Sequence, residues 1–507
     1  MDQTGAPRSR PEDAVVVARD GMVPMRDGVR LATDIYRPAR DGEPLGRHTH
    51  TQVAVNTIHY DRDHPSHLVL PVIPAAREEG AGALRRPPRG RVVGQSEGGE
   101  ARVSDATSPT ATRPQPLAGV RVLEFGQAVS SPLCTMLLGD LGADVVKIEP
   151  PHGDAARGYG PPFVAGESPY FLSVNRNKRS AVINLKHPEG AALVRRLAER
   201  ADIIVTNFRP GVMERLGLGD ETLRAVNPGL IFCQVSGYGP RGPYAGQPSY
   251  DQIAQGMSGL MSVTGTPESG PVRVGVAIAD CLAALFATIG VLGAFAERQR
   301  TGLGQRVDTS LLGAVLGILT YQTGGYLAGG GDPPRVGNDH PVAAPYGAFP
   351  VKDGHINIAV ASEPVWRRLA EAVGHPEWID DPRFASNAER VRHRPVLNAL
   401  LTEALAGDTV DGWVARLNAA GVPCGPIWSI GQALESDVVR HLGIVQQVQH
   451  DRAGLISLIG PAIELTATPP VIRRPPPLLG QHTDEVLGEL GLDAAERARL
   501  RAAGAIG

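Results

Sequence analysis

The stretch 249–300 carries the most regular pattern of apolar positions in the chain. Its second half predicts a long helix, because apolar side chains recur there at spacings of three and four residues. These positions are Ile278, Leu282, Leu285, Phe286, Ile289, Leu292 and Phe295. A helix this apolar is expected to be buried. One carboxylate, Asp280, stands at its start, behind a loop rich in Gly and Pro.

The residues alone leave two interpretations of Asp280. The first is a helix-start Asp that is held by the free backbone N–H groups and the dipole of the first turn, which is a common arrangement. The second is a nucleophilic carboxylate that its apolar surroundings have partly desolvated. An ionised carboxylate in an apolar wall is costly unless it has donors or a catalytic task, so the context of the helix has to decide.

Strand and helix patterns alternate between residues 116 and 235, which predicts a mostly parallel, doubly wound sheet with ligands at the carboxyl ends of its strands. The expected strands are 120–125, 144–148, 181–185, 203–206 and 230–235, with helices at 132–141 and 188–201. The loop after the first strand has no GxGxxG, so a nicotinamide site is poorly supported. Its position before a helix still offers backbone N–H groups to a phosphate.

Basic residues cluster in the loops of this region. The run 175–180 reads NRNKRS, Lys186 follows a strand, and Arg209 and Arg215 flank the turn 207–211. The plain interpretation is a solvated basic face. Gathered at successive strand ends, these residues also suit a ligand that carries several phosphates and an adenine.

Patterning and composition predict five segments: strand-forming residues at 1–75, a disordered linker at 76–115, a first part of the large domain at 116–330, a small domain at 331–445, and a return to the large domain at 446–507. The linker assignment rests on its Arg, Gly, Pro, Ser and Thr content. The small-domain assignment rests on a Gly/Pro-rich connection followed by a hairpin pattern and amphipathic helices.

The composition is that of a globular protein with a sizeable core, since 42% of the 507 residues are hydrophobic and 20% are charged. A net charge of −3 gives no sign of nucleic acid or an acidic membrane as partner. Four widely spaced cysteines without a CxxC argue against disulfides and against a metal site. No apolar run approaches the length of a membrane span without interruption, and the N-terminus lacks a signal-peptide core. We therefore expect a soluble, cytoplasmic protein.

The chain from about residue 116 onward resembles the class III CoA-transferase family, the family of formyl-CoA transferase and carnitine CoA-transferase. The resemblance is carried by ordered blocks that read LAGVRVLEFGQAVSSP, GADVVKIEPPHGD, NKRSAVINLK, NFRPGVMERLGLG, VGVAIADCLAALFA and LLGQHTDEVLGELG. It implies a Rossmann-like large domain, a smaller inserted α+β domain, and a homodimer whose two subunits are interlocked.

The resemblance also implies the site. Asp280 occupies the place of the family's catalytic carboxylate, which attacks an acyl-CoA thioester and carries CoA as an aspartyl thioester to a free carboxylic acid. Coenzyme A is then a substrate, and no permanently bound cofactor is needed. The positions that match the family's CoA contacts are Ala128, Val129, Ser130, Ile183, Lys186, Asn207, Phe208, Arg209, Arg215 and Tyr250.

Departures from the family pattern bear on the substrate. The glycine run of the formyl-CoA transferase branch is replaced by RVGNDHPVAAPYGAF, which looks more like the branch that acts on succinyl-CoA and other dicarboxylates. Asn338, His340 and Tyr346 are candidate side chains for the acid's pocket. Pro248 and Pro150 stand where formyl-CoA transferase has basic residues, so adenine or phosphate contacts differ.

Three alternatives stay open. An α-methylacyl-CoA racemase is a relative of this family, but its active-site His has no counterpart beside Ser249, and proton abstraction next to a thioester requires a base with a pKa near 7. A hydrolase is suggested by residues 21–76, which resemble the ends of the cocaine-esterase/X-prolyl-dipeptidase class; the GxSxG at Ser96 has no strand and helix around it. A CoA-binding protein without activity is the third.

Overall fold

The computed structural model describes residues 15–24, 30–40, 43–44, 59–60, 68–69 and 113–507. The chain divides into two units, Met1–Asp105 and Ala106–Gly507. In the first unit, β1 (Val15–Pro24) pairs antiparallel with β2 (Arg30–Arg40), so the hairpin predicted within residues 21–40 is present and starts earlier. Two-residue strands complete this unit: β3 (Glu43–Pro44) beside β2, and β4 (His59–Tyr60) paired with β5 (Leu68–Val69). Ser96 and most of the predicted linker 76–115 lie outside the described residues.

The second unit contains a sheet of six parallel strands in the order β11-β10-β9-β6-β7-β8. The strands are β6 (Arg121–Phe125), β7 (Asp144–Glu149), β8 (Lys178–Val182), β9 (Ile203–Thr206), β10 (Ile231–Ser236) and β11 (Arg306–Ser310). The first three strands proceed in one direction from β6 and the last three in the other, which is the order of a Rossmann fold. The predicted doubly wound sheet is therefore confirmed. The direction reverses between β6 and β9, and ligands of such sheets bind beyond the carboxyl ends of strands at this point.

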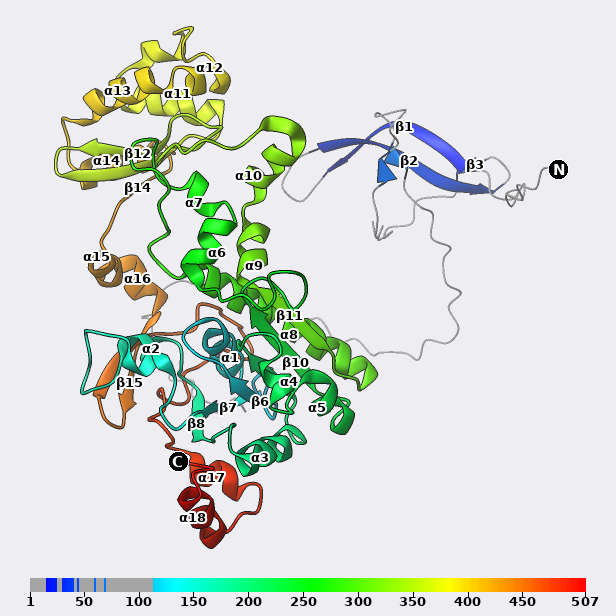
Figure 1. Ribbon diagram of the computed structural model, residues 1–507. Helices are drawn as coiled ribbons and strands as arrows, with labels where there is room; N and C mark the ends of the chain where they lie inside the picture. The colour runs from blue at the N-terminus through cyan, green and yellow to red at the C-terminus, as the bar shows by residue number, and fades with distance from the viewer. Residues whose placement is uncertain (1–14, 25–29, 41–42, 45–58, 61–67, 70–112) are drawn as a thin grey trace, which may run out of the picture. The chain divides into compact units, whose positions relative to one another are not determined.

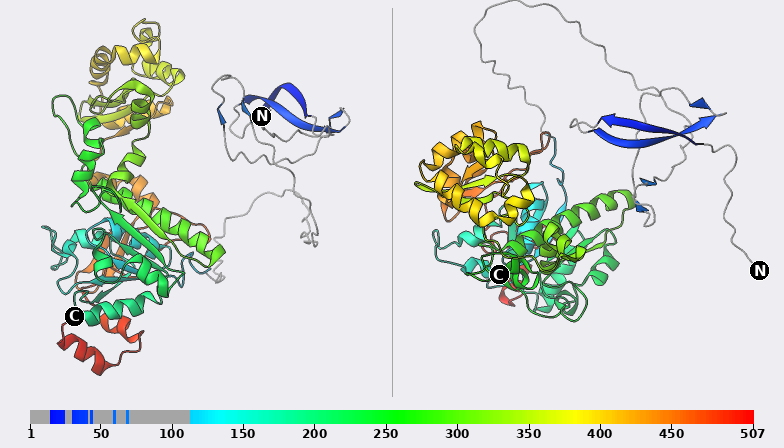
Figure 2. Two further views of the ribbon diagram at one scale, coloured as in Figure 1. Left: turned by 45° about the vertical axis from the view of Figure 1, so that its right-hand side comes forward. Right: turned by 90° about the horizontal axis from the view of Figure 1, so that it is seen from above.

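Helices cover both faces of the sheet (Figure 1 and Figure 2). Alternate strand residues enter separate cores, since Leu123 packs in one buried cluster and Val122 in the other. The Leu123 side is covered by α3 (Pro188–Ala198), α4 (Val212–Arg215), α5 (Asp220–Val226), α17 (Thr483–Gly488) and α18 (Ala494–Ala502). The Val122 side is covered by α1 (Ser130–Asp140), α6 (Asp251–Met257), α8 (Ile278–Thr301) and α9 (Leu311–Ile318).

Helix α8 is the long helix that the apolar pattern predicts. Its small residues Ala283, Ala287 and Val291 are buried in the core of the Val122 side. Contrary to the sequence-based expectation, α8 is long and apolar enough to cross a membrane, with a mean hydropathy of 2.0 over 18 residues. Core helices of soluble proteins meet the same criterion, and α8 packs against α1 and the sheet along its small residues. The expectation that the whole helix is buried is wrong, because Leu285, Phe286 and Ile289 are 47%, 39% and 63% exposed.

Strand β8 begins three residues before the predicted 181–185, and this shift changes the role of the basic run 175–180. Lys178 and Arg179 are the first two residues of the buried strand. Arg179 donates to Asp144 on β7 and to Glu489 after α17, and Arg176 pairs with Asp140 on α1 at 2.6 Å. The prediction that this run faces a phosphate ligand is wrong for these side chains, because carboxylates of neighbouring elements already neutralise them.

A second, smaller sheet follows α9, α10 (Thr320–Gly325) and η2 (Tyr326–Gly330). It contains β12 (Tyr346–Val351), β13 (Gly354–Ala359) and β14 (Cys424–Pro426), all antiparallel. Its core includes Trp366, Phe384 and Trp413. The helices are α11 (Glu363–Ala372), α12 (Asn387–Arg392), α13 (Arg394–Leu405) and α14 (Val410–Ala419), and then α15 (Ile430–Glu435) and α16 (Asp437–Leu442) lead to the hairpin β15 (Val445–His450)–β16 (Gly454–Ile459).

The last residues of the chain return to the Rossmann-like sheet. Ile506 forms an isolated bridge with Ile183, just after β8, and the N–H of Val182 donates to the hydroxyl of Thr483. The remaining short elements are η1 (Ala155–Gly158), α2 (Pro169–Ser173), α7 (Leu260–Val263) and η3 (Pro376–Ile379). The residue limits given above for the predicted domains remain a prediction.

Several charged side chains are buried where β6, β7 and β8 lie side by side. Four of them pair with one another, and we call Glu124, Lys147, Asp154 and Lys178 the buried charge network. The Lys147 Nζ lies 2.6 Å from Glu124 and 2.8 Å from Asp154. The Lys178 Nζ lies 2.8 Å from Glu124. Burial alone would raise the pKa of Glu124, but the charges of Lys147 and Lys178 outweigh it and hold that pKa at about 2. The contribution of Glu124 to stability is therefore complete above its ordinary pKa of 4.5 and is lost as the pH falls toward 2.

The Lys147→Met variant removes the cation that Glu124 and Asp154 share. Loss of one partner leaves a buried charge uncompensated, so we expect a loss of about 3–5 kcal/mol in the free energy of unfolding, measured by urea denaturation. The exposed pair Glu297–Arg300, at 2.6 Å, is the control. Glu297→Gln should cost less than about 1 kcal/mol, and equal urea midpoints for the two variants would contradict the prediction.

Candidate active site

Two loops meet at the point where the strand order reverses. The β6 loop, residues 126–129, leads into α1, and Asn207 follows β9. The Asn207 side chain accepts from the N–H of Gln127 at 3.0 Å and donates to the carbonyl of Gln127 at 2.8 Å. It also donates to the hydroxyl of Ser130 at 3.1 Å. The sheet thus brings together Ser130 and Asn207, two of the predicted CoA contacts, although 76 residues stand between them.

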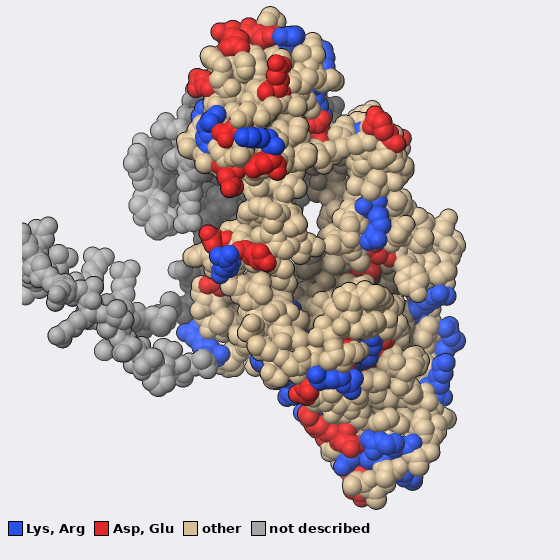
Figure 3. Space-filling model, turned by 90° about the vertical axis from the view of Figure 1, so that its left-hand side faces the viewer, with Lys and Arg blue, Asp and Glu red and all other residues tan. Residues whose placement is uncertain are grey.

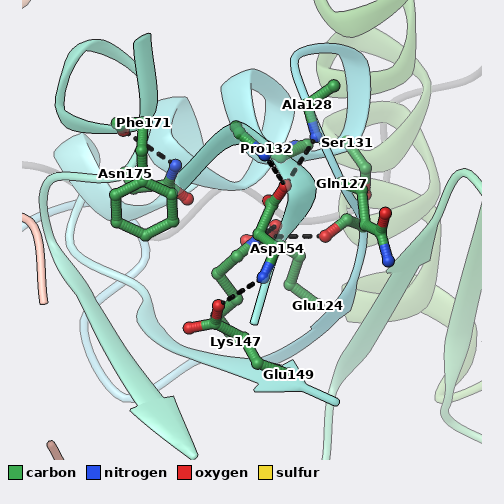
Figure 4. A network of polar contacts seen from close by, with 12 residues as sticks. Glu124, Gln127, Ala128, Ser131, Pro132, Lys147, Glu149, Asp154, Phe171 and Asn175 are labelled. Carbon is green, nitrogen blue, oxygen red and sulfur yellow. Dashed lines mark hydrogen bonds and ion pairs between the residues drawn. The ribbon is translucent and has the colours of Figure 1, made fainter. Parts of the chain in front are cut away.

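The β6 loop is also held from below, by the buried charge network (Figure 4). The N–H of Ala128 donates to Asp154 Oδ1 at 3.1 Å, and Lys147 donates to the carbonyl of Gly126 at 2.8 Å. Ala128 has a φ of +61°, a left-handed conformation that residues other than Gly, Asn and Asp adopt rarely. Val129 follows as the N-cap of α1, and its side chain is buried.

Asp280 lies in the first turn of α8 and faces Ser130. Burial raises the pKa of Asp280 to about 6, the charge of Asp251 adds to this rise, and a hydrogen bond from the Ser130 hydroxyl opposes it. A carboxylate with these surroundings is partly desolvated and keeps one donor, and a perturbed pKa of this kind is common among groups that carry chemistry. The arrangement suits a nucleophile that loses little hydration when a substrate arrives.

Asp280 lies in the first turn of α8, as both interpretations require, but among the described hydrogen bonds none joins its carboxylate to the N–H groups at the start of its own helix. The carboxylate that serves the start of α8 belongs to Asp251, the first residue of α6, whose Oδ1 accepts from the N–H of Ala279 at 2.8 Å. Its other oxygen accepts from Gln255 at 2.7 Å, and Gln255 in turn accepts from the N–H of Val274 at 2.9 Å. Because Asp251 accepts the hydrogen bond at the start of α8, the Asp280 carboxylate is not needed for it and can take part in another interaction.

Other side chains with titratable groups surround Asp280. Burial raises the pKa of the Tyr170 hydroxyl, and the charge of Asp280 adds to the rise. Burial likewise raises the pKa of the Cys281 thiol, again with Asp280 contributing. Tyr170 packs edge to face on Tyr159, with 5.2 Å between ring centroids. Of the two rings, Tyr170 is the one whose hydroxyl the Asp280 charge influences, and Tyr159 supports it from the side.

The other predicted CoA contacts occupy different environments. Lys186, Arg209 and Arg215 are exposed, and the first two follow the carboxyl ends of β8 and β9, where phosphates of a ligand could reach them. Tyr250 is exposed at the N-cap of α6. The side chains of Ile183 and Phe208 face inward: Ile183 is fully buried in the core, and Phe208 is half-buried against it. Ile183 has no exposed surface and its N–H donates to the carbonyl of Glu149 at 3.0 Å, so the prediction that it contacts CoA is wrong in this structure.

The three candidates for the acid's pocket lie before and within the smaller sheet. His340 stacks between Tyr321 and Tyr346, with ring centroids 5.4 and 5.0 Å apart. Its N–H donates to the carbonyl of Tyr346 at 2.8 Å, and Asn338 is exposed. Among the described contacts of this chain, none joins these three residues to Asp280, so their assignment remains a prediction.

Sequence reasoning missed three residues of this site. Asp251 directly follows Tyr250, and its position at a predicted helix start was the available signal. Tyr159 and Tyr170 lie in the irregular segment between β7 and β8, and nothing in the local pattern distinguishes them. Only the fold brings that segment to the start of α8.

The sheet order defines a doubly wound α/β protein, and the start of α8 with the Asp280 carboxylate lies beside the loop at its switch point. The profile of CoA-transferase family III matches residues 117–483, and the chain belongs to this family. It is a class III CoA-transferase, an enzyme that moves CoA between an acyl-CoA and a carboxylate. The family resemblance seen in the sequence is confirmed, whereas the hydrolase resemblance of residues 21–76 gained no support.

Similar proteins agree with this assignment. Succinyl-CoA:glutarate CoA-transferase of Mus musculus is 39% identical over 409 residues, covering 80% of this chain and 93% of that protein. Succinate–glutarate CoA-transferase of Agrobacterium fabrum is 39% identical over 386 residues, covering 75% and 96%. A solved structure of a CAIB/BAIF family protein from Brucella suis matches with a TM-score of 0.68 and 37% identity, covering 75% of this chain and 100% of that one.

The Asp280→Asn variant distinguishes a catalytic carboxylate from a stabilising one. Because the folded-state pKa of Asp280 is raised from 3.8 to about 6, ionisation weakens the fold, and the loss grows as the pH rises between these values. We therefore expect Asp280→Asn to unfold at a higher temperature than the wild type at pH 8, by an amount that corresponds to at most about 3 kcal/mol. At pH 3.5 the two proteins should differ little, and a variant that is less stable than the wild type at pH 8 would contradict the prediction.

Proposed function

We propose that Asp280 is the nucleophile of a CoA transfer between a dicarboxylic acyl-CoA and a free carboxylic acid. The observation that carries the proposal is a mostly buried carboxylate with a raised pKa at the start of α8, beside the switch point of the sheet, while Asp251 accepts from the N–H of Ala279 at that helix start. Positioning and desolvation are the main means of making a carboxylate reactive, because it is otherwise a weak nucleophile.

The chemistry proceeds by exchange between acyl groups of similar energy. An Asp280 oxygen attacks the thioester carbonyl, a C–O bond forms, the C–S bond breaks, and CoA leaves as its thiolate with a mixed anhydride on Asp280. The thiolate attacks the aspartyl carbonyl, forming aspartyl-CoA and releasing the donor's acid. The acceptor acid then repeats both steps in reverse. No net proton or electron is exchanged, so CoA serves as substrate alone.

The substrate class follows from two observations. Two similar proteins, from Mus musculus and Agrobacterium fabrum, carry names in which succinyl-CoA or succinate is paired with glutarate, and the loop 335–349 has no run of glycines. We infer a dicarboxylic donor such as succinyl-CoA and a short-chain dicarboxylic acceptor. Lys186, Arg209 and Arg215 are the cations for the CoA phosphates, because all three are exposed. We place the reaction in the cytoplasm.

The racemase alternative requires an imidazole base beside the thioester. Ser249 occupies that position here, and its hydroxyl is buried without a partner among the described residues. The groups that act on the pKa of Asp280 are Asp251 and Ser130, and neither of them is the imidazole base that racemisation of this kind uses. Transfer is therefore favoured over racemisation.

The test is covalent trapping at Asp280. Protein incubated with succinyl-CoA is treated with hydroxylamine, which converts an aspartyl thioester or anhydride to a hydroxamate, and the peptide that contains Asp280 is examined by mass spectrometry. We expect modification of the wild type and none of Asp280→Asn, with loss of CoA transfer to glutarate by at least about 1,000-fold. Cys281→Ser is the matched control for modification of the adjacent thiol and should retain the label.

An unlabelled wild type that still transfers CoA would contradict the role of Asp280. Bound CoA without turnover of succinyl-CoA or other acyl-CoA donors would support the inactive alternative.

We further propose that the chain is a homodimer with an extensive apolar interface. Leu285, Phe286 and Ile289 form an exposed stripe on the outer side of α8, and Ile289 is 63% exposed. Leu327 beyond α10 and Ile430 on α15 are more exposed still. Figure 3 shows one face on which broad areas carry no charged side chain. Apolar patches of this kind mark protein interfaces, and the family resemblance points to a second copy of this chain.

Sedimentation equilibrium tests the dimer. We expect the wild type to sediment as a dimer and Ile289→Asp to contain a smaller dimer fraction, because the substitution places a charge within an apolar interface. Val226→Asp is the matched control, since Val226 is similarly exposed, at 58%, but lies at the end of α5 on the other side of the sheet. A monomeric wild type, or equal dimer fractions in both variants, would contradict the proposal.

A further inference from the structure

The β6 loop has a conformation that its own sequence does not favour. Ala128 sits at a φ of +61° without being Gly, Asn or Asp, so a force outside the loop must hold it there. Its N–H points downward to Asp154 Oδ1, at 3.1 Å (Figure 4). Asp154 is 2% exposed, and a buried, ionised acceptor makes a stronger hydrogen bond than a neutral one.

Asp154 is itself fixed from three directions. Its Oδ2 lies 2.8 Å from the Lys147 ammonium, its Oδ1 also accepts from the N–H of Ala156 at 2.9 Å, and its own N–H donates to Glu149 at 2.9 Å. The carboxylate therefore cannot follow the loop if the loop relaxes. It acts as a rigid point to which the loop is attached.

The buried charge network holds the start and the centre of the loop, and also the first turn of α1 that follows it. Lys147 donates to the carbonyl of Gly126 at 2.8 Å, and Lys178 donates to the carbonyl of Pro132 at 2.7 Å. Asp154 holds the centre, at Ala128. Two residues further on, Ser130 begins α1, which packs against α8, so the torsion angles of Ala128 set the direction in which Ser130 meets the start of α8.

We propose that Asp154 is a positioning residue for acyl transfer: by holding Ala128 in the left-handed conformation, it keeps Ser130 aligned on the Asp280 carboxylate. This inference rests on the proposed role of Asp280. Asp154 touches neither Asp280 nor the site of the thioester, and its effect passes entirely through the loop. Small displacements of such supporting elements weaken catalysis strongly, because the reacting atoms must be held within a narrow range of geometry.

Two substitutions of Asp154 separate positioning from stability. Asp154→Ala removes both the charge and the acceptor for Ala128, whereas Asp154→Asn removes the charge and keeps a carbonyl oxygen. Both should lower the unfolding temperature, since both leave Lys147 undercompensated. Only Asp154→Ala should lower kcat for transfer from succinyl-CoA to glutarate by about 100-fold. A loss of kcat that follows the loss of stability equally in both variants would overturn the proposal.

A second substitution tests the torsion angle directly. In the Asp154→Ala protein, Ala128→Gly should restore kcat by at least about tenfold, since Gly enters the left-handed region without steric cost. The four proteins form a double-mutant cycle, and an effect of Ala128→Gly that is the same with and without Asp154 would overturn the proposal. If Asp154→Ala does not fold, the same cycle is carried out with Asp154→Leu, which also removes the acceptor for Ala128 but fills the space of the carboxylate.

The pH dependence of kcat/KM is a further test, because it would not change if Asp154 only stabilised the fold. Asp280 is faced by Ser130 from α1, Asp251 from α6, Tyr170 from α2 and the adjacent Cys281. Among these groups only Ser130 lowers its pKa. Ser130→Ala should therefore shift the acid limb of kcat/KM to higher pH, and Asp154→Ala should shift it in the same direction. An acid limb of Asp154→Ala that coincides with the wild type would overturn the proposal.

Asp140→Ala is the matched control. Asp140 is as buried as Asp154 and pairs with Arg176 at 2.6 Å, but it lies at the far end of α1. It should reduce stability with little effect on kcat. Hydroxylamine trapping distinguishes a failure of the proposed function from a failure of the positioning role. A wild type without label at Asp280 refutes the proposed function. A labelled wild type together with an equally rapidly labelled Asp154→Ala refutes only the positioning role of Asp154.

Discussion

The site depends on two carboxylates and two ammonium groups that are buried together. They lie under the carboxyl ends of β6 and β7 and the start of β8, and they fix the loop on which the site is built. A charge in a low-dielectric interior is tolerated only when it is paired and hydrogen-bonded, and Glu124, Lys147, Asp154 and Lys178 satisfy one another with no net charge. The unused hydrogen-bonding capacity of these groups goes to the backbone of the β6 loop. A strained loop can therefore be kept rigid at the point where the sheet reverses its order.

The start of α8 shows how a helix can present a reactive carboxylate. An Asp in the first turn ordinarily gains from the free N–H groups there. In this protein, Asp251 on α6 takes the N–H of Ala279 and also places its negative charge near Asp280. Burial and this charge raise the pKa of Asp280, and Ser130 keeps it from rising further. The balance yields a group that is ionised at neutral pH but only weakly solvated.

Much of the fold was predictable, because alternation of apolar strands and amphipathic helices is a local signal. The strands near 121, 144, 203 and 231 lie where the pattern puts them. β8 was misplaced by three residues, because Lys178 and Arg179 read as loop residues. Their partners Glu124, Asp144 and Glu489 are 35 to 310 residues away along the chain, and no local rule announces a buried lysine whose countercharge lies on another strand.

The sequence by itself determined the parallel α/β architecture, the long apolar helix and Asp280 at its start, since each depends on the order and spacing of neighbouring residues. Only the tertiary structure decided which acidic residue caps α8, which basic residues remain exposed for a phosphate ligand, and which side chains hold the β6 loop. These outcomes depend on distances between elements far apart in the chain. Burial and pairing change the behaviour of a charged group only when those elements come together.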